Sequence, residues 1–220
     1  MEAAADPAGP AVCVIDVGAP RNLGWAVVAP GVARPETFDG LLALLPDLVR
    51  SRRLCLGFEA PLFLPRVDDW RDFTKARRGD GSRPWSAGAG AAVAVIGLAL
   101  LVHVLERLRE ASPEAEATLD PGLPARPGRI LIFEAFVAGA AKRTAPDASG
   151  AVRPTTRHED AAAAAQAYAR MRGQAGTVSA VTAERPFSLA GAALLAAGWG
   201  SDLGLPAAPC LVVRPGAMVL

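Results

Sequence analysis

The chain has 220 residues, of which 51% are hydrophobic, and its formal net charge at pH 7 is +1. This length is enough for one well-packed α/β domain, and the apolar fraction excludes a disordered chain. A net charge near zero excludes a whole-protein field that would attract nucleic acid, so any polyanion site must be local.

Residues 1–10 have neither a cationic start nor an apolar core, so we expect no secretory signal there. We expect these residues to form a disordered tail and residues 11–220 to form a single domain. The cysteines Cys13, Cys55 and Cys210 are odd in number and lack metal-ligand spacing. We therefore expect buried thiols in a reducing, cytoplasmic compartment.

The first predicted element is a β-hairpin. The apolar run Val12–Ile15 is followed by Asp16, Gly18 and a polar turn, and a second strand runs from about Leu23 to Ala29. A buried strand has no packing use for an acid at its carboxyl end. The hairpin therefore predicts that Asp16 belongs to a functional site.

The next elements are short. Glu36–Phe38 is expected to add a third strand, and Gly40–Arg52 a helix capped by Asp39, although Pro46 favours a break in it. Leu54–Phe58 has strand character and is followed directly by Glu59.

Pro61–Ser86 is predicted to be a long loop in which Trp70, Phe73 and Trp85 are interleaved with charged residues. Its basic residues are Arg66, Arg71, Lys75, Arg77, Arg78 and Arg83. Long loops in compact domains often carry function, and basic residues beside aromatic ones suit phosphate contact and base stacking. The alternative is a solvated loop without a binding role, whose aromatic side chains pack against the rest of the domain.

An apolar helix is predicted over Ala91–Glu110. The segment Ala87–Leu105 is long enough to span a bilayer, but it is rich in Gly and Ala. We expect a buried core helix and no contact with a membrane, with a membrane span as the alternative. The same helix could serve a homodimer interface.

The strand Arg129–Phe133 is followed by Glu134, and a helix is predicted over Thr156–Arg172. Thr156 and Glu159 have capping-box spacing, and Asp160 lies in the first turn, where the helix dipole favours an anion. A helix over Leu189–Ala197 and an edge strand over Cys210–Val213 complete the predicted elements.

Four carboxylates fall at the ends of these elements: Asp16, Glu59 and Glu134 end strands, and Asp160 begins a helix. If the strands are neighbours, their carboxyl ends share the sheet edge at which α/β proteins bind ligands. Clustered carboxylates must be protonated, paired with bases, or bound to cations, and oxygen donors favour Mg²⁺ or Mn²⁺. Two such ions about 4 Å apart can support in-line attack on a phosphodiester, provided that the carboxylates converge within about 5 Å of a common point.

Some of these side chains have structural alternatives. Glu134 could pair with Lys142 or Arg143. Glu159 is interpreted as a capping residue, and His158 is either a ligand or proton shuttle, or an exposed residue at the start of the helix.

The predicted elements and their acids resemble the ribonuclease H-like superfamily. The resemblance lies in the hairpin with Asp16 and Gly18, the strand ending in Glu59, and the helix that opens HEDAAAA. It is similar to the Holliday-junction resolvase (RuvC-like) branch. It is closer still to an uncharacterised family of predicted nucleases, through the pieces FEAPLFLP, IFEAF and SLAGAALL. The resemblance covers roughly Val12 to Ala197.

The resemblance implies an α/β fold with a mixed five-stranded sheet of order 3-2-1-4-5, the first three strands antiparallel, and helices on both faces. It also implies two-metal phosphodiester hydrolysis. Asp16, Glu59 and Asp160 match the acids of the first strand, the fourth strand and the last helix. Glu134 is less standard in the resolvases, so its role as metal ligand, base or support stays open.

We therefore expect a nuclease that uses two Mg²⁺ or Mn²⁺ ions on DNA or RNA. The expected nucleic-acid contacts are Arg21, Lys75, Arg77, Arg78, Arg83 and Lys142. One alternative is a catalytically silent binding module of the same fold. Another is a phosphate-binding protein of the sugar-kinase or actin-like ATPase type, although those proteins use two such domains and this chain has one strand–Asp–Gly hairpin.

Overall fold

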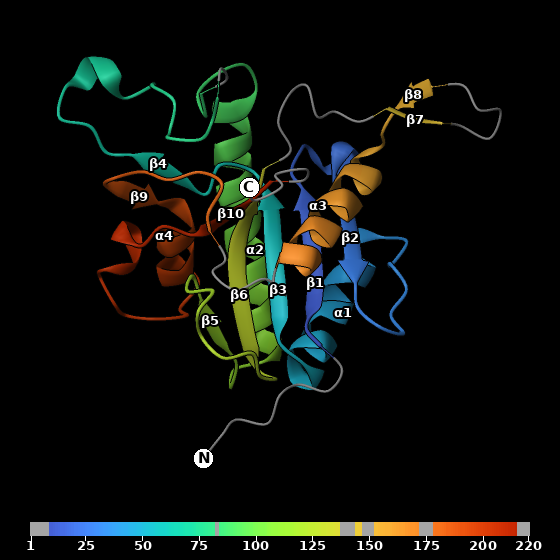
Figure 1. Cartoon of the computed structure of the whole chain (residues 1–220). Helices are drawn as coiled ribbons and strands as arrows, with labels where there is room; N and C mark the ends of the chain where they lie inside the picture. The colour runs from blue at the N-terminus through green and yellow to red at the C-terminus, as the bar shows by residue number, and fades with distance from the viewer. Residues whose placement is uncertain (1–8, 82–83, 137–143, 147–151, 172–177, 215–220) are drawn as a thin grey trace.

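The computed structural model describes residues 9–81, 84–136, 144–146, 152–171 and 178–214. Its centre is a mixed six-stranded sheet (Figure 1). The strand order is β10 (Leu211–Val213), β6 (Arg129–Ala135), β3 (Leu54–Glu59), β1 (Ala11–Asp16) and β2 (Gly24–Val28), and β5 (Glu116–Thr118) also pairs with β6. Only the β1–β2 pair is antiparallel in this sheet.

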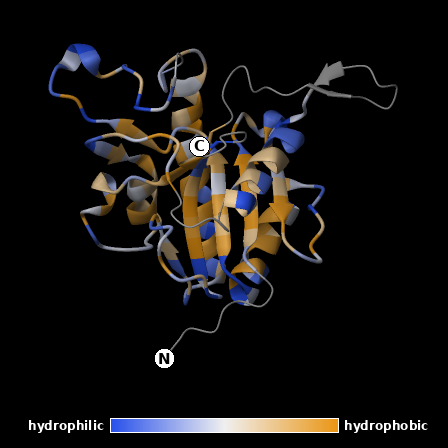
Figure 2. Cartoon of the chain, viewed as in Figure 1, coloured by the Kyte–Doolittle hydropathy of each residue, from blue (hydrophilic) through white to orange (hydrophobic). Residues whose placement is uncertain are grey.

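Helices cover both faces of the sheet. On one face α1 (Phe38–Ser51), α2 (Gly90–Ala111) and α4 (Leu189–Ala196) bury leucines and alanines against the strands. On the other face α3 (Arg157–Met171) packs alanines against β1 and β2. Figure 2 shows the result as hydrophobic strands and helix faces at the centre, with hydrophilic residues in the outer loops.

Several short strands and 3-10 helices lie outside the central sheet and its α-helices. β4 (Phe63–Pro65) pairs antiparallel with β9 (Pro186–Ser188), and β7 (Thr144–Pro146) with β8 (Val152–Pro154). Short 3-10 helices lie at η1 (Pro20–Asn22), η2 (Trp70–Asp72) and η4 (Leu205–Ala207). The long loop between β4 and α2 carries η2 at its outer end (Figure 1).

The α/β class, the mixed sheet and the helices on both faces are confirmed. The predicted five-stranded order 3-2-1-4-5 is wrong, because Glu36–Phe38 forms no strand. Trp25 Nε1 donates to the carbonyl oxygen of Pro35 at 2.9 Å, and the Thr37 hydroxyl accepts from the Gly40 N–H at 3.0 Å. These bonds turn the chain into α1 directly, so Thr37 is the cap and not Asp39.

Pro46 lies inside α1 and does not end it, so the predicted helix forms and the alternative of a break at Pro46 is wrong. The helix α2 is long and apolar enough to cross a membrane by length and composition, and 33% of its most apolar window is buried. One side of α2 packs Leu101, Leu105 and Leu108 into the core, whereas Val95 and Ile96 are exposed.

Candidate functional site

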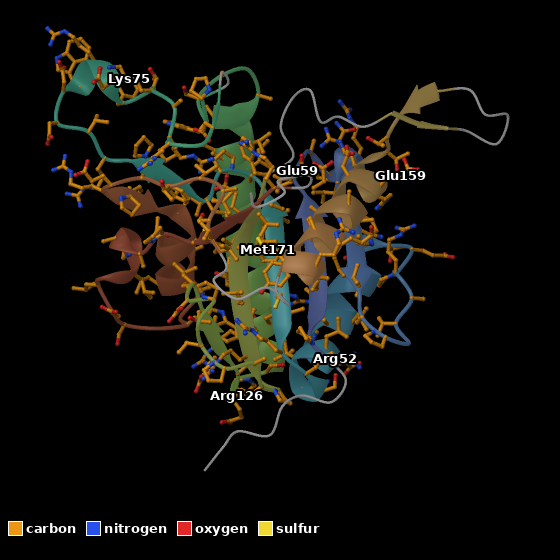
Figure 3. The ribbon with its side chains drawn as sticks, in the orientation of Figure 1. Arg52, Glu59, Lys75, Arg126, Glu159 and Met171 are labelled. Atoms are coloured by element: carbon orange, nitrogen blue, oxygen red, sulfur yellow. The ribbon has the colours of Figure 1, made fainter. Side chains whose placement is uncertain are left out.

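Asp16 and Glu59 lie side by side where β1 and β3 end. The two strands are parallel, and Asp16 is the direct register partner of Glu59. Register partners in a parallel pair point to the same face of the sheet. Val14, two residues before Asp16 on β1, packs on the face that α3 covers, so Asp16 and Glu59 point to that face as well. Asp16 is 6% exposed, and Figure 3 shows Glu59 at the end of its strand.

The first turn of α3 approaches the same end of the sheet. Gly24 on β2 is the register partner of Asp16. A Cβ atom on Gly24 would lie 2.5 Å from the backbone carbonyl carbon of Arg157, so glycine is needed for this close approach. Asp160, one turn along α3, is 6% exposed and accepts a hydrogen bond from the Thr155 hydroxyl at 2.6 Å.

A capping box fixes the start of α3. The Thr156 N–H donates to Glu159 at 2.6 Å, and the Glu159 N–H donates to the Thr156 hydroxyl at 3.3 Å. His158 packs edge-on against Trp25, with its Nδ1 3.0 Å from the backbone nitrogen of that residue. Glu159 therefore caps the helix as interpreted, and His158 fastens α3 to β2 and is not the exposed residue of the structural alternative.

Arg157 faces the central acid. Its Nη1 lies 2.9 Å from an oxygen of Asp16 and also donates to the carbonyl oxygen of Val17 at 3.4 Å. Sequence reasoning missed this residue, although a signal was present. A cation in the first turn of a helix is disfavoured by the helix dipole, so its presence there indicates an anionic partner.

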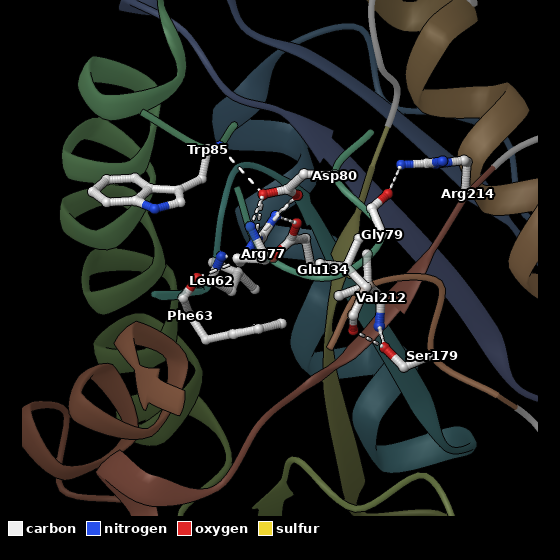
Figure 4. Close-up of polar contacts among 11 residues, drawn as sticks. Leu62, Phe63, Arg77, Gly79, Asp80, Trp85, Glu134, Ser179, Val212 and Arg214 are labelled. Atoms are coloured by element: carbon white, nitrogen blue, oxygen red, sulfur yellow. Dashed lines mark hydrogen bonds and ion pairs between the residues drawn. The ribbon is translucent and has the colours of Figure 1, made fainter. Parts of the chain in front are cut away.

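Glu134 lies on the opposite face of the sheet. Its register partner on β3 is Phe58 and not Glu59, so its side chain points toward α2, away from Asp16. It is fully buried and accepts from Arg77 Nη1 and Nη2, each at 2.7 Å, and from the Leu62 N–H at 2.9 Å (Figure 4). The predicted convergence of four carboxylates is therefore wrong for Glu134, whose described ion-pair partner is Arg77. Lys142 and Arg143, the partners considered from the sequence, lie outside the described residues.

Arg77 is the centre of a buried charge cluster that we call the latch: Arg77, Asp80 and Glu134. The Arg77 side chain is 0% exposed and also pairs with Asp80, at 3.0 Å from Nη2. Nη1 donates to the carbonyl oxygen of Phe63 at 3.1 Å. Burial lowers the pKa of Arg77, but Glu134 and then Asp80 outweigh it and raise the pKa above its ordinary value. Arg77 therefore cannot contact nucleic acid at the surface, contrary to its predicted role.

The other predicted nucleic-acid contacts are dispersed. Arg21 is exposed at the tip of η1, and Lys75 is paired with Asp72 at 2.8 Å on the outer loop (Figure 3). Arg78 is exposed near the base of that loop. Arg83 and Lys142 lie outside the described residues.

The fit to a divalent cation is partial. Asp16 and Glu59 supply adjacent carboxylates of the kind that Mg²⁺ and Mn²⁺ prefer, and Asp160 belongs to the same face and the same end of the sheet. Within the described part of the chain, no group of three or more His, Cys, Asp or Glu side chains is close enough to hold a metal ion. The two-ion arrangement with four ligands is not assembled here, because Glu134 belongs to the latch.

Comparison with protein-family models, with curated proteins and with solved structures finds no match to this chain. The resemblance to the ribonuclease H-like superfamily therefore stays a prediction. The geometry of the three acids on the α3 face is the basis on which a function can be proposed.

Proposed function

We propose that this chain is a divalent-cation-dependent hydrolase of phosphodiester bonds in nucleic acid. The observation that carries the proposal is the register match of Asp16 with Glu59 at the carboxyl ends of two adjacent parallel strands. Ligands of α/β proteins bind at this edge of the sheet, and two carboxylates brought together there need a counter-charge.

Asp16 and Glu59 would hold the cation. Asp160 lies at the same end of the sheet but is not counted as a third ligand, because within the described residues no three such side chains are close enough to share a metal ion. A bound Mg²⁺ or Mn²⁺ would supply Lewis acidity and lower the pKa of a bound water. The residues of the chain hold the carboxylates in position. The Asp16 side chain is almost closed to solvent, and the Thr155 hydroxyl orients Asp160. Glu134 is not part of the proposed ligand set.

The decisive experiment is a cleavage panel. Purified protein is incubated with single-stranded, duplex, flap and junction DNA and with RNA, in the presence of Mg²⁺, Mn²⁺ or EDTA. We expect cleavage of at least one substrate with either metal, and loss of cleavage with EDTA. Asp16→Asn and Glu59→Gln should each abolish cleavage while the circular dichroism spectrum and the melting temperature stay close to those of the wild type.

A matched control is Glu116→Gln. This residue is also an acid on a strand of the sheet, β5, but its carboxylate pairs with Arg126 and Arg129 at the other end of the sheet. The variant should cleave like the wild type. If no nucleic acid is cut with either metal, the hydrolase proposal fails.

The Arg157–Asp16 ion pair favours a second candidate function, a catalytically silent binding module. In that case a guanidinium permanently supplies the counter-charge that a cation would supply in an enzyme. If the chain is a silent module, the wild-type protein and the Asp16→Asn variant should bind nucleic acid equally well, with or without EDTA. Neither protein should cut it. Binding measured by fluorescence anisotropy beside the cleavage panel separates the two.

A further inference from the structure

A pocket lies away from the three acids, between the base of the long loop and the chain that leads into β9. Its volume is about 540 Å³, which is in the range of small-molecule sites. The loop contributes Arg66, Asp68 and Arg78, and the opposite wall contributes Thr182, Glu184 and Arg185.

The backbone fixes both walls of this pocket. The Arg66 N–H donates to the carbonyl oxygen of Arg185 at 2.7 Å, which extends the antiparallel β4–β9 pair by one step. Arg78 and Thr182 exchange backbone hydrogen bonds of 3.1 and 2.8 Å. Arg77, the residue before Arg78, is held by its buried ion pairs with Asp80 and Glu134 (Figure 4).

The charges of the lining favour an anion. The lining contains four arginines and two carboxylates, and Arg77 is already neutralised by the latch. The ion pair between Arg185 and Asp68 is weak, because the Asp68 side chain is 92% exposed. Within the described part of the chain, the side chains of Arg66 and Arg78 make no hydrogen bond or ion pair. Both guanidinium groups are thus available to a ligand, and their planar fork matches the oxygens of a phosphate.

We propose that this pocket binds the phosphate group of a nucleotide-sized anion, through Arg66, Arg78 and Arg185. The phosphate could belong to a free nucleotide or to the end of a nucleic-acid strand, since both present the same group. This site is separate from the acids and does not rest on the proposed hydrolysis.

The test is isothermal titration calorimetry in EDTA and low salt, so that no divalent cation takes part. The probes are inorganic pyrophosphate, a nucleoside 5′-monophosphate, and a short single strand with and without a 5′-phosphate. We expect pyrophosphate and the monophosphate to bind, and the double variant Arg66→Ala/Arg78→Ala to weaken both by at least about tenfold, which corresponds to about 1.4 kcal/mol. If the natural source is a strand end, the 5′-phosphate should strengthen binding of the strand; if it is a free nucleotide, the monophosphate should bind tighter than either strand.

The control double variant is Arg50→Ala/Arg107→Ala, which removes the same charge from the groove between α1 and α2. It should bind the probes like the wild type, and both double variants should unfold at the wild-type urea concentration. Equal loss of binding in the two double variants would mean that net charge alone attracts the anions, and the site would be rejected. The site would also be rejected if the wild-type protein bound none of the probes.

Discussion

Arg77 donates from both terminal nitrogens to the two oxygens of Glu134, each at 2.7 Å, in a region where neither side chain is open to solvent. The pair joins the long loop to β6. Because the Leu62 N–H also donates to Glu134, the pair fixes the turn after Glu59 as well. An acid expected to bind a metal and an arginine expected to bind phosphate thus neutralise one another in the core.

Replacing Arg77 with Ala should destabilise the fold strongly. The substitution leaves Glu134 and Asp80 buried without a counter-charge, and breaking a buried ion pair in this way costs about 3–5 kcal/mol. The measurement is the free energy of unfolding in urea at pH 7. Arg107→Ala is the control, because its pair with Glu110 is largely exposed and should contribute less than about 1 kcal/mol. Similar losses in both variants would contradict a stabilising latch.

Arg157 should compete with a cation for Asp16. If the proposed metal site is correct, Arg157→Gln removes a positive charge 2.9 Å from a ligand oxygen and should tighten Mn²⁺ binding by about tenfold. Titration calorimetry with Mn²⁺ measures the affinity without reference to activity. Arg170→Gln, at the far end of α3, removes the same charge and should leave the affinity unchanged. Identical Mn²⁺ affinities for Arg157→Gln and the wild type would count against cation binding at Asp16.

Gly24→Ala should displace the first turn of α3. The added Cβ would meet the backbone of Arg157 at 2.5 Å, and backbone atoms cannot yield as a flexible side chain can. We expect a loss of about 1–3 kcal/mol in the free energy of unfolding. Under the proposed function, the variant should also lose cation-dependent cleavage, because the displaced turn lies directly beside Asp16.

Gly200→Ala is the control for this substitution. Its added Cβ would meet only a leucine side-chain atom, at the ordinary contact distance of 3.5 Å. The change in stability should therefore stay within about 0.5 kcal/mol. Two alanine variants of equal stability would show that α3 does not need the close approach at Gly24.

Stability should fall in alkaline solution through the Cys13 thiol. Burial raises the pKa of Cys13 from 9.0 to about 12 in the folded protein. The folded state therefore holds a proton that the unfolded state loses between these values. The resulting stabilisation is fully present below pH 9 and is lost as the pH rises toward 12, at up to about 1.4 kcal/mol per pH unit.

The check is the free energy of unfolding from pH 8 upward for the wild type and for Cys13→Ala. The wild type should lose stability more steeply above pH 9 than the variant, which lacks the thiol. Parallel curves would contradict a raised thiol pKa. The same burial predicts that a thiol reagent labels Cys13, Cys55 and Cys210 only after denaturation.

Local sequence determined most of the elements. The apolar runs predicted β1, β2, β3 and β6 within one or two residues, and the spacing of Thr156 and Glu159 predicted the capping box of α3. These features depend on interactions between residues close in the chain. The strand predicted over Glu36–Phe38 is absent. The hydrogen bond from Trp25 to Pro35, ten residues along the chain, and the helix cap at Thr37 hold this segment in another conformation.

The sequence also determined that Asp16, Glu59 and Glu134 lie at the ends of buried strands. Only the tertiary structure decided which face of the sheet each acid points to. In a sheet with alternating side chains, a register difference of one residue reverses the face. Asp16 is paired with Glu59, but Glu134 is paired with Phe58, and no local pattern in the chain encodes that offset. The offset places two acids beside α3 and sends the third into the core, where Arg77 neutralises it.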